Sequence, residues 1–204
     1  IPLNLSAALQ HILDLVSRGH VYHVTGRIPL HKAHRLASKF ADRYNVDWSR
    51  NQRAYFKQKG RSSVHLVMLP TSDEGSLDWV LLATPGQSRI FEEEKHLKDV
   101  REPGQKLTFR AYELVRWKRP RRKDGKTTWT WRRTRPAMRR WKAAIRLEAR
   151  HPSASGLQGV LNAVARQPGF SGVREQTRRL YQYAREQSGD RKDIRYAILR
   201  RFGA

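Results

Sequence analysis

Apolar residues recur along the first part of the chain with helical and strand periods in turn. Residues 6–18 place apolar side chains three and four positions apart and are followed by Gly19, which predicts a helix that ends there. The run HVYHVTGRI (20–28) is typical of a buried strand. Pro29 then opens a predicted helix that continues to about Tyr44, with apolar residues along one face.

Strand patterns follow this helix. The segment RAYFKQKGRSSVHLVML (53–69) predicts a hairpin that turns at Lys59-Gly60, and LDWVLLAT (77–84) predicts an interior strand. The predicted order is therefore a helix followed by β-α-β-β-β. Residues 87–102 form the one acidic stretch, with three consecutive Glu, and indicate a short helix or an ordered loop.

A long basic hairpin is predicted over residues 107–134. The strand KLTFRAYELVRWK (106–118) would pair with TTWTWRRT (127–134) through Asp124-Gly125, a residue pair that two-residue type I′ turns prefer. That turn would place Lys118 opposite Trp131, and Trp117 opposite Arg132.

From Thr134 onward the period is helical. Helices are predicted over 135–150, 157–167, 173–187 and 190–202. The fold class is thus α+β: an antiparallel or mixed sheet with packed helices (ferredoxin-like or related), a long basic β-hairpin, and a small C-terminal helical portion. We expect an α+β nucleic-acid-binding domain over residues 1–150 and a helical portion, resembling a helix-turn-helix, over 156–204.

Charge points to the class of partner. The 204 residues carry a net charge of +24 with a pI near 11.3, which is typical of proteins that bind a polyanion. Arg outnumbers Lys, 30 to 12, and Arg makes the bidentate phosphate contacts that nucleic acid favours. The absence of Cys excludes disulfides, thiol catalysis and Cys-based zinc sites. No apolar run of about 18 residues and no signal-peptide pattern occurs, so we expect no membrane partner and a cytoplasmic, or in a bacterium nucleoid-associated, location.

The hairpin combines cations and indoles on both faces. One face would carry Arg116, Lys118, Trp129, Trp131 and Arg133, and the other Trp117, Arg119, Arg121 and Arg132. Aromatic rings stack on unpaired bases for roughly 1–3 kcal/mol each, and cations at the tip hold phosphates. An alternative stays open, in which the Trp side chains are core and the Arg side chains a solvated rim. The candidate nucleic-acid-binding residues here and in the next helix are Arg116, Lys118, Arg119, Arg121, Arg122, Lys123, Lys126, Trp129, Trp131, Arg132, Arg133, Arg139 and Arg140.

The C-terminal helices supply a second candidate surface. In the segment 157–187, two predicted helices flank the turn PGFSG, as in a helix-turn-helix. The outward face of the second helix would carry Arg174, Arg178, Gln182 and Arg185, with Arg179 near its edge. Arg reads guanine or phosphate, and Gln reads adenine. An ordinary basic surface helix is the alternative.

Catalytic alternatives rest on few residues. The segments VYHVTGR (21–27) and SVHLVML (63–69) resemble strands of small single-strand transposases, which use a His-hydrophobe-His metal motif. The resemblance covers about twenty residues and implies metal-dependent cleavage of single-stranded DNA, with Tyr183 as nucleophile and Gln187 four residues on. Ser63 stands where the first metal-binding His would be, which leaves His65 alone, so we do not assign the family.

A second catalytic alternative is a metal-dependent nuclease built on Asp78, Glu93 and Lys95. Its Glu-x-Lys element should lie on a strand beside the Asp, whereas FEEEKHLKD (91–99) indicates a helix or loop.

The sequence therefore favours a nucleic-acid-binding protein without catalysis, metal or cofactor. DNA is slightly favoured over RNA, and protein partners in a nucleoprotein assembly are expected. A single-strand DNA endonuclease and a basic scaffold for an acidic protein are the alternatives.

Overall fold

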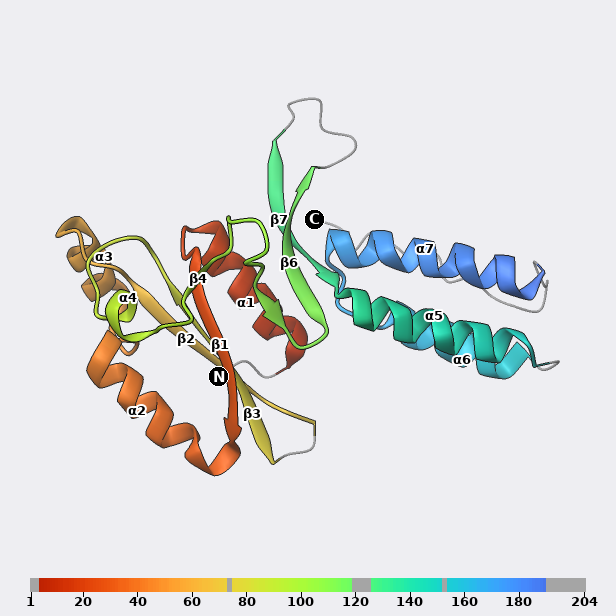
Figure 1. Ribbon diagram of the computed structural model, residues 1–204, viewed down its shortest axis with the longest axis horizontal. Coiled ribbons are helices and arrows are strands. Elements are labelled where there is room, and N and C mark those ends of the chain that lie inside the picture. Colours follow the sequence, from red (N-terminus) through yellow and green to blue (C-terminus); the bar gives the residue numbers. More distant parts are fainter. Residues whose placement is uncertain (1–3, 73–74, 119–125, 152–153, 190–204) are drawn as a thin grey trace. The chain divides into compact units, whose positions relative to one another are not determined.

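The computed structural model describes residues 4–72, 75–118, 126–151 and 154–189 (Figure 1). The predicted class is confirmed: the protein is α+β, with antiparallel sheets, packed helices and a C-terminal helical portion. Two compact units divide at Arg110, so the basic hairpin belongs with the C-terminal helices. The sequence pattern had placed this boundary near residue 150.

The first unit, residues 1–110, contains most of the strands. Its elements are α1 (Leu5–Ser17), β1 (Tyr22–Pro29), the 3-10 turn η1 (Leu30–Lys32), α2 (Ala33–Tyr44), α3 (Arg50–Gln58), β2 (Val64–Pro70), β3 (Ser76–Ala83), α4 (Ile90–Glu93), β4 (Lys98–Asp99) and β5 (Thr108–Phe109). The short helix α4 lies in the acidic stretch where a short helix or loop was predicted.

The predicted hairpin at Lys59-Gly60 is wrong, because its first arm is the helix α3. Ser49 starts this helix with a capping box: its hydroxyl accepts from the Gln52 amide at 3.3 Å, and the Gln52 side chain accepts from the Ser49 amide at 2.8 Å. The Phe56 ring of this helix stacks on Trp48 at 4.1 Å.

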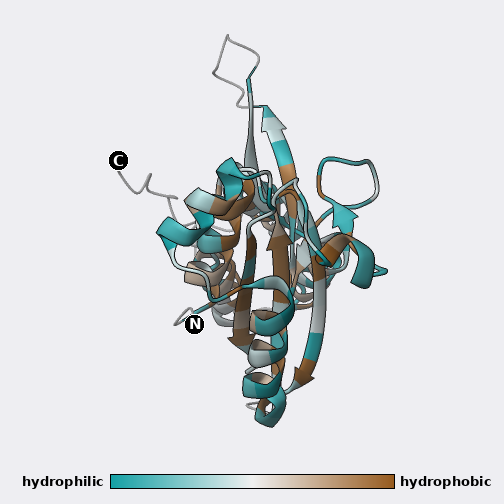
Figure 2. Ribbon diagram, turned by 90° about the vertical axis from the view of Figure 1, so that its left-hand side faces the viewer, coloured by the Kyte–Doolittle hydropathy of each residue, from teal (hydrophilic) through white to brown (hydrophobic). Residues whose placement is uncertain are grey.

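The four-stranded sheet has the order β2-β3-β1-β4, and each neighbouring pair is antiparallel. On one face, Val24 and Leu81 pack with Phe40 of α2 in a buried cluster. Side chains alternate along a strand, so His65 faces the other way, where its ring lies 6.4 Å from that of His11 in α1. Helices thus cover both faces of the sheet, and Figure 2 shows hydrophobic residues concentrated on its strands.

Asp78 on β3 is buried between two arginines. Arg27 donates to one carboxylate oxygen at 2.7 Å and Arg110 to the other at 2.9 Å. Arg110 adopts φ of 54°, in the left-handed region that non-glycine residues rarely enter. This conformation ends β5, so the single strand predicted over 106–118 is broken.

The second unit, residues 111–204, consists of a hairpin and three helices among the described residues. These are β6 (Tyr112–Lys118), β7 (Thr127–Arg133), α5 (Arg135–Ala149), α6 (Ala154–Ala165) and α7 (Ser171–Ser188). The predicted helix over 190–202 and the predicted turn at Asp124-Gly125 lie outside the described residues.

The register of the hairpin differs from the prediction by four residues. Leu114 lies opposite Trp131, and Lys118 lies opposite Thr127. Leu114 and Trp131 are both fully buried. A buried face fixes register more strongly than a turn preference does, and an even shift preserves which side chains share a face.

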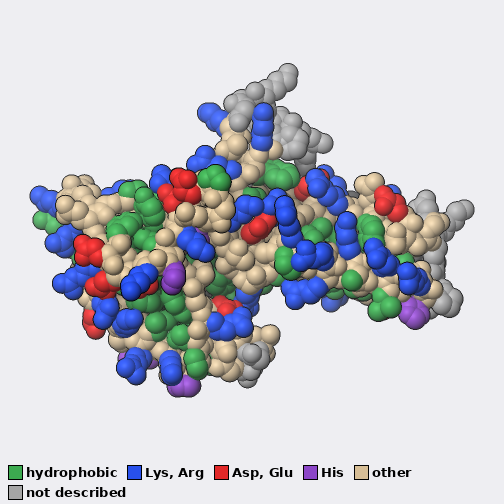
Figure 3. Space-filling model, viewed as in Figure 1, with side chains coloured by type: hydrophobic (Ala, Val, Ile, Leu, Met, Phe, Trp, Pro, Cys, Tyr) green, Lys and Arg blue, Asp and Glu red, His purple; other side chains and the backbone are tan. Residues whose placement is uncertain are grey.

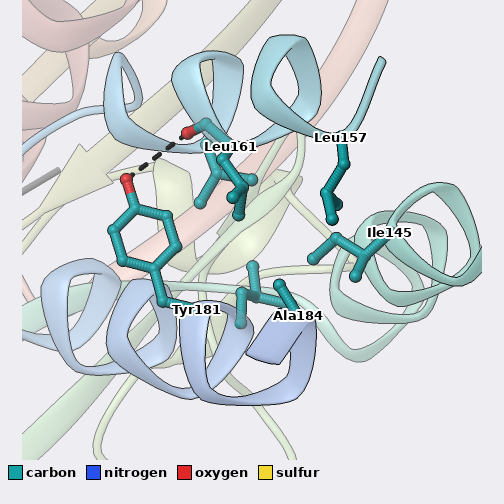
Figure 4. Close-up of a cluster of buried hydrophobic side chains, with 7 residues drawn as sticks. Ile145, Leu157, Leu161, Tyr181 and Ala184 are labelled. Atoms are coloured by element: carbon teal, nitrogen blue, oxygen red, sulfur yellow. Dashed lines mark hydrogen bonds between the residues drawn. The ribbon is translucent and has the colours of Figure 1, made fainter. Parts of the chain in front are cut away.

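The three helices share one buried cluster. Ile145 of α5, Leu161 of α6, and Tyr181 and Ala184 of α7 point toward one another (Figure 4). The Tyr181 hydroxyl donates to the Leu161 carbonyl at 3.4 Å. The helices therefore stabilise one another as a small bundle.

Close backbone contacts join β7 to α7. The guanidinium of Arg133 donates to the Val173 carbonyl at 3.1 Å and to the Thr177 hydroxyl at 3.1 Å. The side-chain amide of Gln176 accepts a hydrogen bond from the backbone N–H of Arg133 at 2.6 Å and donates one to the backbone carbonyl of Arg133 at 3.0 Å. It thus pairs with this residue as the backbone of a neighbouring strand would. Gly172 permits this approach, because a Cβ there would lie 2.6 Å from the Trp131 carbonyl oxygen.

We predict that Gly172→Ala destabilises the second unit by about 1–3 kcal/mol, because α7 would have to move away from β7. Gly159→Ala is the matched control: a Cβ on this α6 residue meets nothing within 4 Å. The control should stabilise the helix by roughly 0.5–1 kcal/mol. Urea unfolding followed by circular dichroism measures both changes. An equal change in the free energy of unfolding of the two variants would contradict the close contact between Gly172 and the Trp131 carbonyl.

The first unit should also lose stability in acid. Burial lowers the pKa of His20 and of His23 to about 4, and that of His65 to about 3, from an ordinary value of 6.5. The unfolded chain then binds more protons than the folded unit below pH 6.5, so the free energy of unfolding falls as pH drops from 6.5 toward 4. Each histidine lowers the free energy of unfolding by at most about 1.4 kcal/mol for each pH unit of this decrease.

Urea titrations between pH 7 and pH 5 test this, in a range where most carboxylates stay ionised. His65→Gln should flatten the pH dependence. A stability that is constant across this range would contradict the buried, neutral histidines.

Candidate nucleic-acid interface

Most of the positive charge lies in the second unit. Residues 111–204 contain 25 Lys and Arg against 7 Asp and Glu, so this unit carries +18 of the net +24. Like charges at this density repel one another, and a polyanion relieves that repulsion. The second unit is therefore where contacts with phosphates are expected first.

The hairpin presents a cation–indole pair. Arg116 lies directly opposite Trp129, and its guanidinium carbon is 5.1 Å from the centroid of the Trp129 ring. Arg116 and Lys118 are exposed and Trp129 is half-buried, so all three are accessible, as is Lys126 just before β7. Arg119, Arg121, Arg122 and Lys123 lie outside the described residues.

Three other hairpin candidates serve the fold. Trp131 is 0% exposed and Arg133 is 1% exposed. Arg132 forms an ion pair with Glu113 on the neighbouring strand. The core interpretation, which the sequence left open, applies to Trp131, because the observed register places it away from the charged tip. Of these three residues, which the sequence suggested as stacking and phosphate contacts, Trp131 and Arg133 are buried, whereas Arg132 is ion-paired and its side chain is 34% exposed.

The guanidinium of Arg133 is occupied by contacts within the second unit. Its guanidinium contacts the Val164 carbonyl near the end of α6 at 3.2 Å, besides the two contacts with α7. No carboxylate pairs with it among the described residues, and burial lowers its pKa. It donates to backbone carbonyls of two helices, Val164 near the C-terminal end of α6 and Val173 in the first turn of α7.

A row of cations runs along α5. Arg135, Arg139, Lys142 and Arg146 are exposed and lie four, three and four residues apart, which places them on one face. We call these four residues the α5 basic stripe; at 1.5 Å per residue it extends about 16 Å. None of the four has a carboxylate partner in the described part of the chain. Lys and Arg side chains line the helices of this unit in Figure 3.

The α5 basic stripe was only partly found from the sequence. Arg139 and Arg140 were candidates and both are exposed, but Arg135, Lys142 and Arg146 were missed. The spacing of the cations along the predicted helix is the signal that would have identified them.

Tyr183 of α7 borders the α5 basic stripe. Arg146 donates to its hydroxyl at 3.1 Å, and the Lys142 ammonium lies 5.0 Å from its ring centroid. The two helices thus form one surface with an aromatic side chain among cations. This combination suits a phosphate backbone with an adjacent sugar or base.

The candidate cations of α7 are partly compensated. Arg178 donates to Glu175 at 3.1 Å and Arg179 to the same carboxylate at 3.3 Å. Gln182 donates to Glu186 at 3.1 Å. Arg185 is exposed and Arg174 is half-buried. Because Glu175 partly neutralises Arg178 and Arg179, α7 offers a less positively charged surface than α5. Exposed ion pairs of this kind are weak, so a phosphate could replace the carboxylate.

The residues of the two catalytic alternatives lie in the following environments. His65 lies beside Arg53 at 3.5 Å and belongs to the first unit, whereas Tyr183 and the exposed Gln187 belong to the second. Asp78 is paired with two arginines, and Glu93 accepts from Arg43 at 2.9 Å. The described residues contain no group of three side chains placed to hold a metal ion.

Comparison with family models, with curated proteins and with solved structures found no match for this chain. Within the described residues, every helix is too short or too polar to cross a membrane. A function is therefore inferred from the residues of the chain itself.

We predict that the triple variant Arg139→Ala, Lys142→Ala, Arg146→Ala weakens binding to duplex DNA and lowers its salt dependence. Each lost phosphate contact should reduce the slope of log K against log salt by about 0.9. The control removes three exposed cations from the first unit by Arg50→Ala, Lys57→Ala, Lys59→Ala. Fluorescence anisotropy across a salt series measures both slopes. The same reduction in the two triple variants would show that net charge alone matters.

Proposed function

We propose that this chain is a non-catalytic nucleic-acid-binding protein whose second unit grips the phosphate backbone. The observation that carries the proposal is the α5 basic stripe, in which four cations lie on one helix face without carboxylate partners in the described part of the chain. Repulsion among these like charges destabilises the folded protein, and binding to a row of phosphates offsets that repulsion.

The hairpin supplies a second contact. Arg116 over Trp129 offers a guanidinium and an indole together, which suits an unpaired base and its phosphate. The cations at the hairpin tip would extend this contact along the backbone. A rigid helical stripe and a narrow β-ribbon together fit a structured or partly single-stranded nucleic acid.

DNA is the slightly favoured ligand, and the protein would act within a larger nucleoprotein assembly. The α7 face, with Arg174, Arg178, Arg179, Gln182 and Arg185, supports base-edge contacts in duplex DNA, in the manner of a helix-turn-helix. Glu175 and Glu186 occupy part of this face, so it is less positively charged than the α5 basic stripe.

We further propose that the first unit is related to ferredoxin-like folds. The strand order β2-β3-β1-β4, with α2 in the connection from β1 to β2, supports this relationship. Single-strand binders of such folds stack bases on an open sheet face. Here α1 covers the second face, which directs the proposed contacts to the second unit instead.

The scaffold alternative has one specific observation in its favour. A groove of about 490 Å³ on the first unit has Ile28 and Leu36 in its lining together with Lys32, Arg35 and Lys39. An acidic amphipathic segment of a partner protein would place its apolar residues in the groove and its carboxylates on the rim. The groove is compatible with a protein partner in the same assembly.

The test is anisotropy of the full chain against equal-length duplex DNA, single-stranded DNA, single-stranded RNA and an RNA hairpin across a salt series. A steep salt slope with a preferred ligand supports the proposal. Weak binding to all four at moderate salt would contradict it and favour the scaffold. Cleavage in the presence of Mg²⁺ or Mn²⁺ that disappears with Tyr183→Phe would instead support the endonuclease.

We predict that replacing Arg121, Arg122, Lys123 and Lys126 by Ala lowers affinity by at least a hundredfold, because each phosphate contact contributes electrostatically. The matched control replaces Lys32, Arg35, Lys39 and Arg50 of the first unit by Ala. Unchanged binding of the tip variant would remove the hairpin from the proposed interface.

A further inference from the structure

A small polar cavity lies in the first unit, apart from all the residues proposed above. It has a volume of about 160 Å³ and is lined by His23, Val24, Thr25, His96, Lys98, Lys106 and Thr108. This volume admits a group the size of a tetrahedral oxyanion. The lining joins β1 and β4 to the segment around β5.

The sheet itself brings three of these side chains together. His23 and Thr25 are two residues apart on β1 and therefore share a face. Lys98 of β4 lies directly opposite His23 in the antiparallel pair, so its side chain rises from the same face. The polar lining is thus set by strand register.

His23 is the buried member of the set. It is 3% exposed, and its Nδ1 atom has no hydrogen-bond partner among the described residues. A buried polar atom without a partner costs about 1–3 kcal/mol, so a ligand that supplies an acceptor to an Nδ1–H group would be bound favourably.

Every other polar side chain of the lining can donate a hydrogen bond. The set comprises two ammonium groups, two Thr hydroxyls and a second imidazole, and no carboxylate lines the cavity. The nearest acidic neighbour along β4, Asp99, is engaged by Arg101 at 2.6 Å. A lining with two cations and no carboxylate, around a space of this size, suits a small oxyanion.

We propose that this cavity binds a phosphate group. His23 Nδ1–H donates to one oxygen from the floor, while Lys98, Lys106, Thr25 and Thr108 contact the others from the rim. The phosphate is either the terminal phosphate of a nucleic-acid strand or free inorganic phosphate. The inference goes beyond the proposed function, because it concerns the first unit and does not need the α5 basic stripe.

The test follows the imidazole resonances of ¹⁵N-histidine-labelled full-length protein at fixed pH and ionic strength. The His23 signal is assigned by its loss in His23→Gln. Inorganic phosphate, added against chloride, should shift this signal saturably. Lys98→Gln or Thr108→Val should weaken the binding about tenfold. Lys57→Gln, an exposed cation on α3, should not.

A second arm identifies the source of the phosphate. A 5′-phosphorylated thymidine dinucleotide is compared with its 5′-hydroxyl form. Shifts at lower concentration with the phosphorylated form than with inorganic phosphate indicate a strand terminus. Equal affinity for the two phosphates indicates free phosphate as the ligand.

Two results would overturn the inference. One is the absence of a saturable His23 shift with either phosphate, and the other is an equal response of Lys98→Gln and Lys57→Gln. Neither result bears on the proposed function, because duplex affinity is measured separately and depends on α5. Conversely, a chain with the α5 triple substitution should still bind phosphate at His23.

Discussion

The second unit depends on the hydrogen bonds that the buried guanidinium of Arg133 donates to α6 and α7. This guanidinium joins the last residue of β7 to carbonyls of α6 and α7, while Gln176 pairs with the backbone of the same residue. An unpaired cation in a core is costly unless several acceptors surround it. Those acceptors come from two helices, so hairpin and bundle must pack together for the charge to be tolerated. The basic hairpin is thereby attached to a rigid base.

The same residue type has the opposite role on α5. There the guanidiniums face solvent, the inner side of the helix carries Ile145 and the shared core, and carboxylates are absent from the stripe in the described part of the chain. Burial with neutral acceptors makes Arg133 structural, whereas exposure without compensation leaves the stripe available for a polyanion. Composition alone does not separate these cases, because both appear as Arg in a basic sequence.

Much of the fold was readable from periodicity. The helices α1, α2, α5, α6 and α7 and the strands β1, β3 and β7 follow from apolar spacing and from boundary residues such as Gly19. The helix α3 was not found, because the segment 53–69 was interpreted as a hairpin and the capping box at Ser49 was not recognised. The register of the hairpin could not be derived, since burial of Trp131 against Leu114 outweighs the preference of an Asp-Gly turn. For the candidate site, charge indicated a region of the chain, but only packing reveals which of its arginines are buried.

The most direct test of the central claim is arginine footprinting with phenylglyoxal, read by mass spectrometry with and without saturating duplex DNA. The account predicts that DNA protects Arg135, Arg139 and Arg146 from modification. Arg50, exposed on α3 of the first unit, should react equally in both states. Arg133 should remain unreactive throughout, because it is buried. Unchanged reactivity of the three α5 arginines in a chain that binds DNA would contradict the account and place the interface elsewhere.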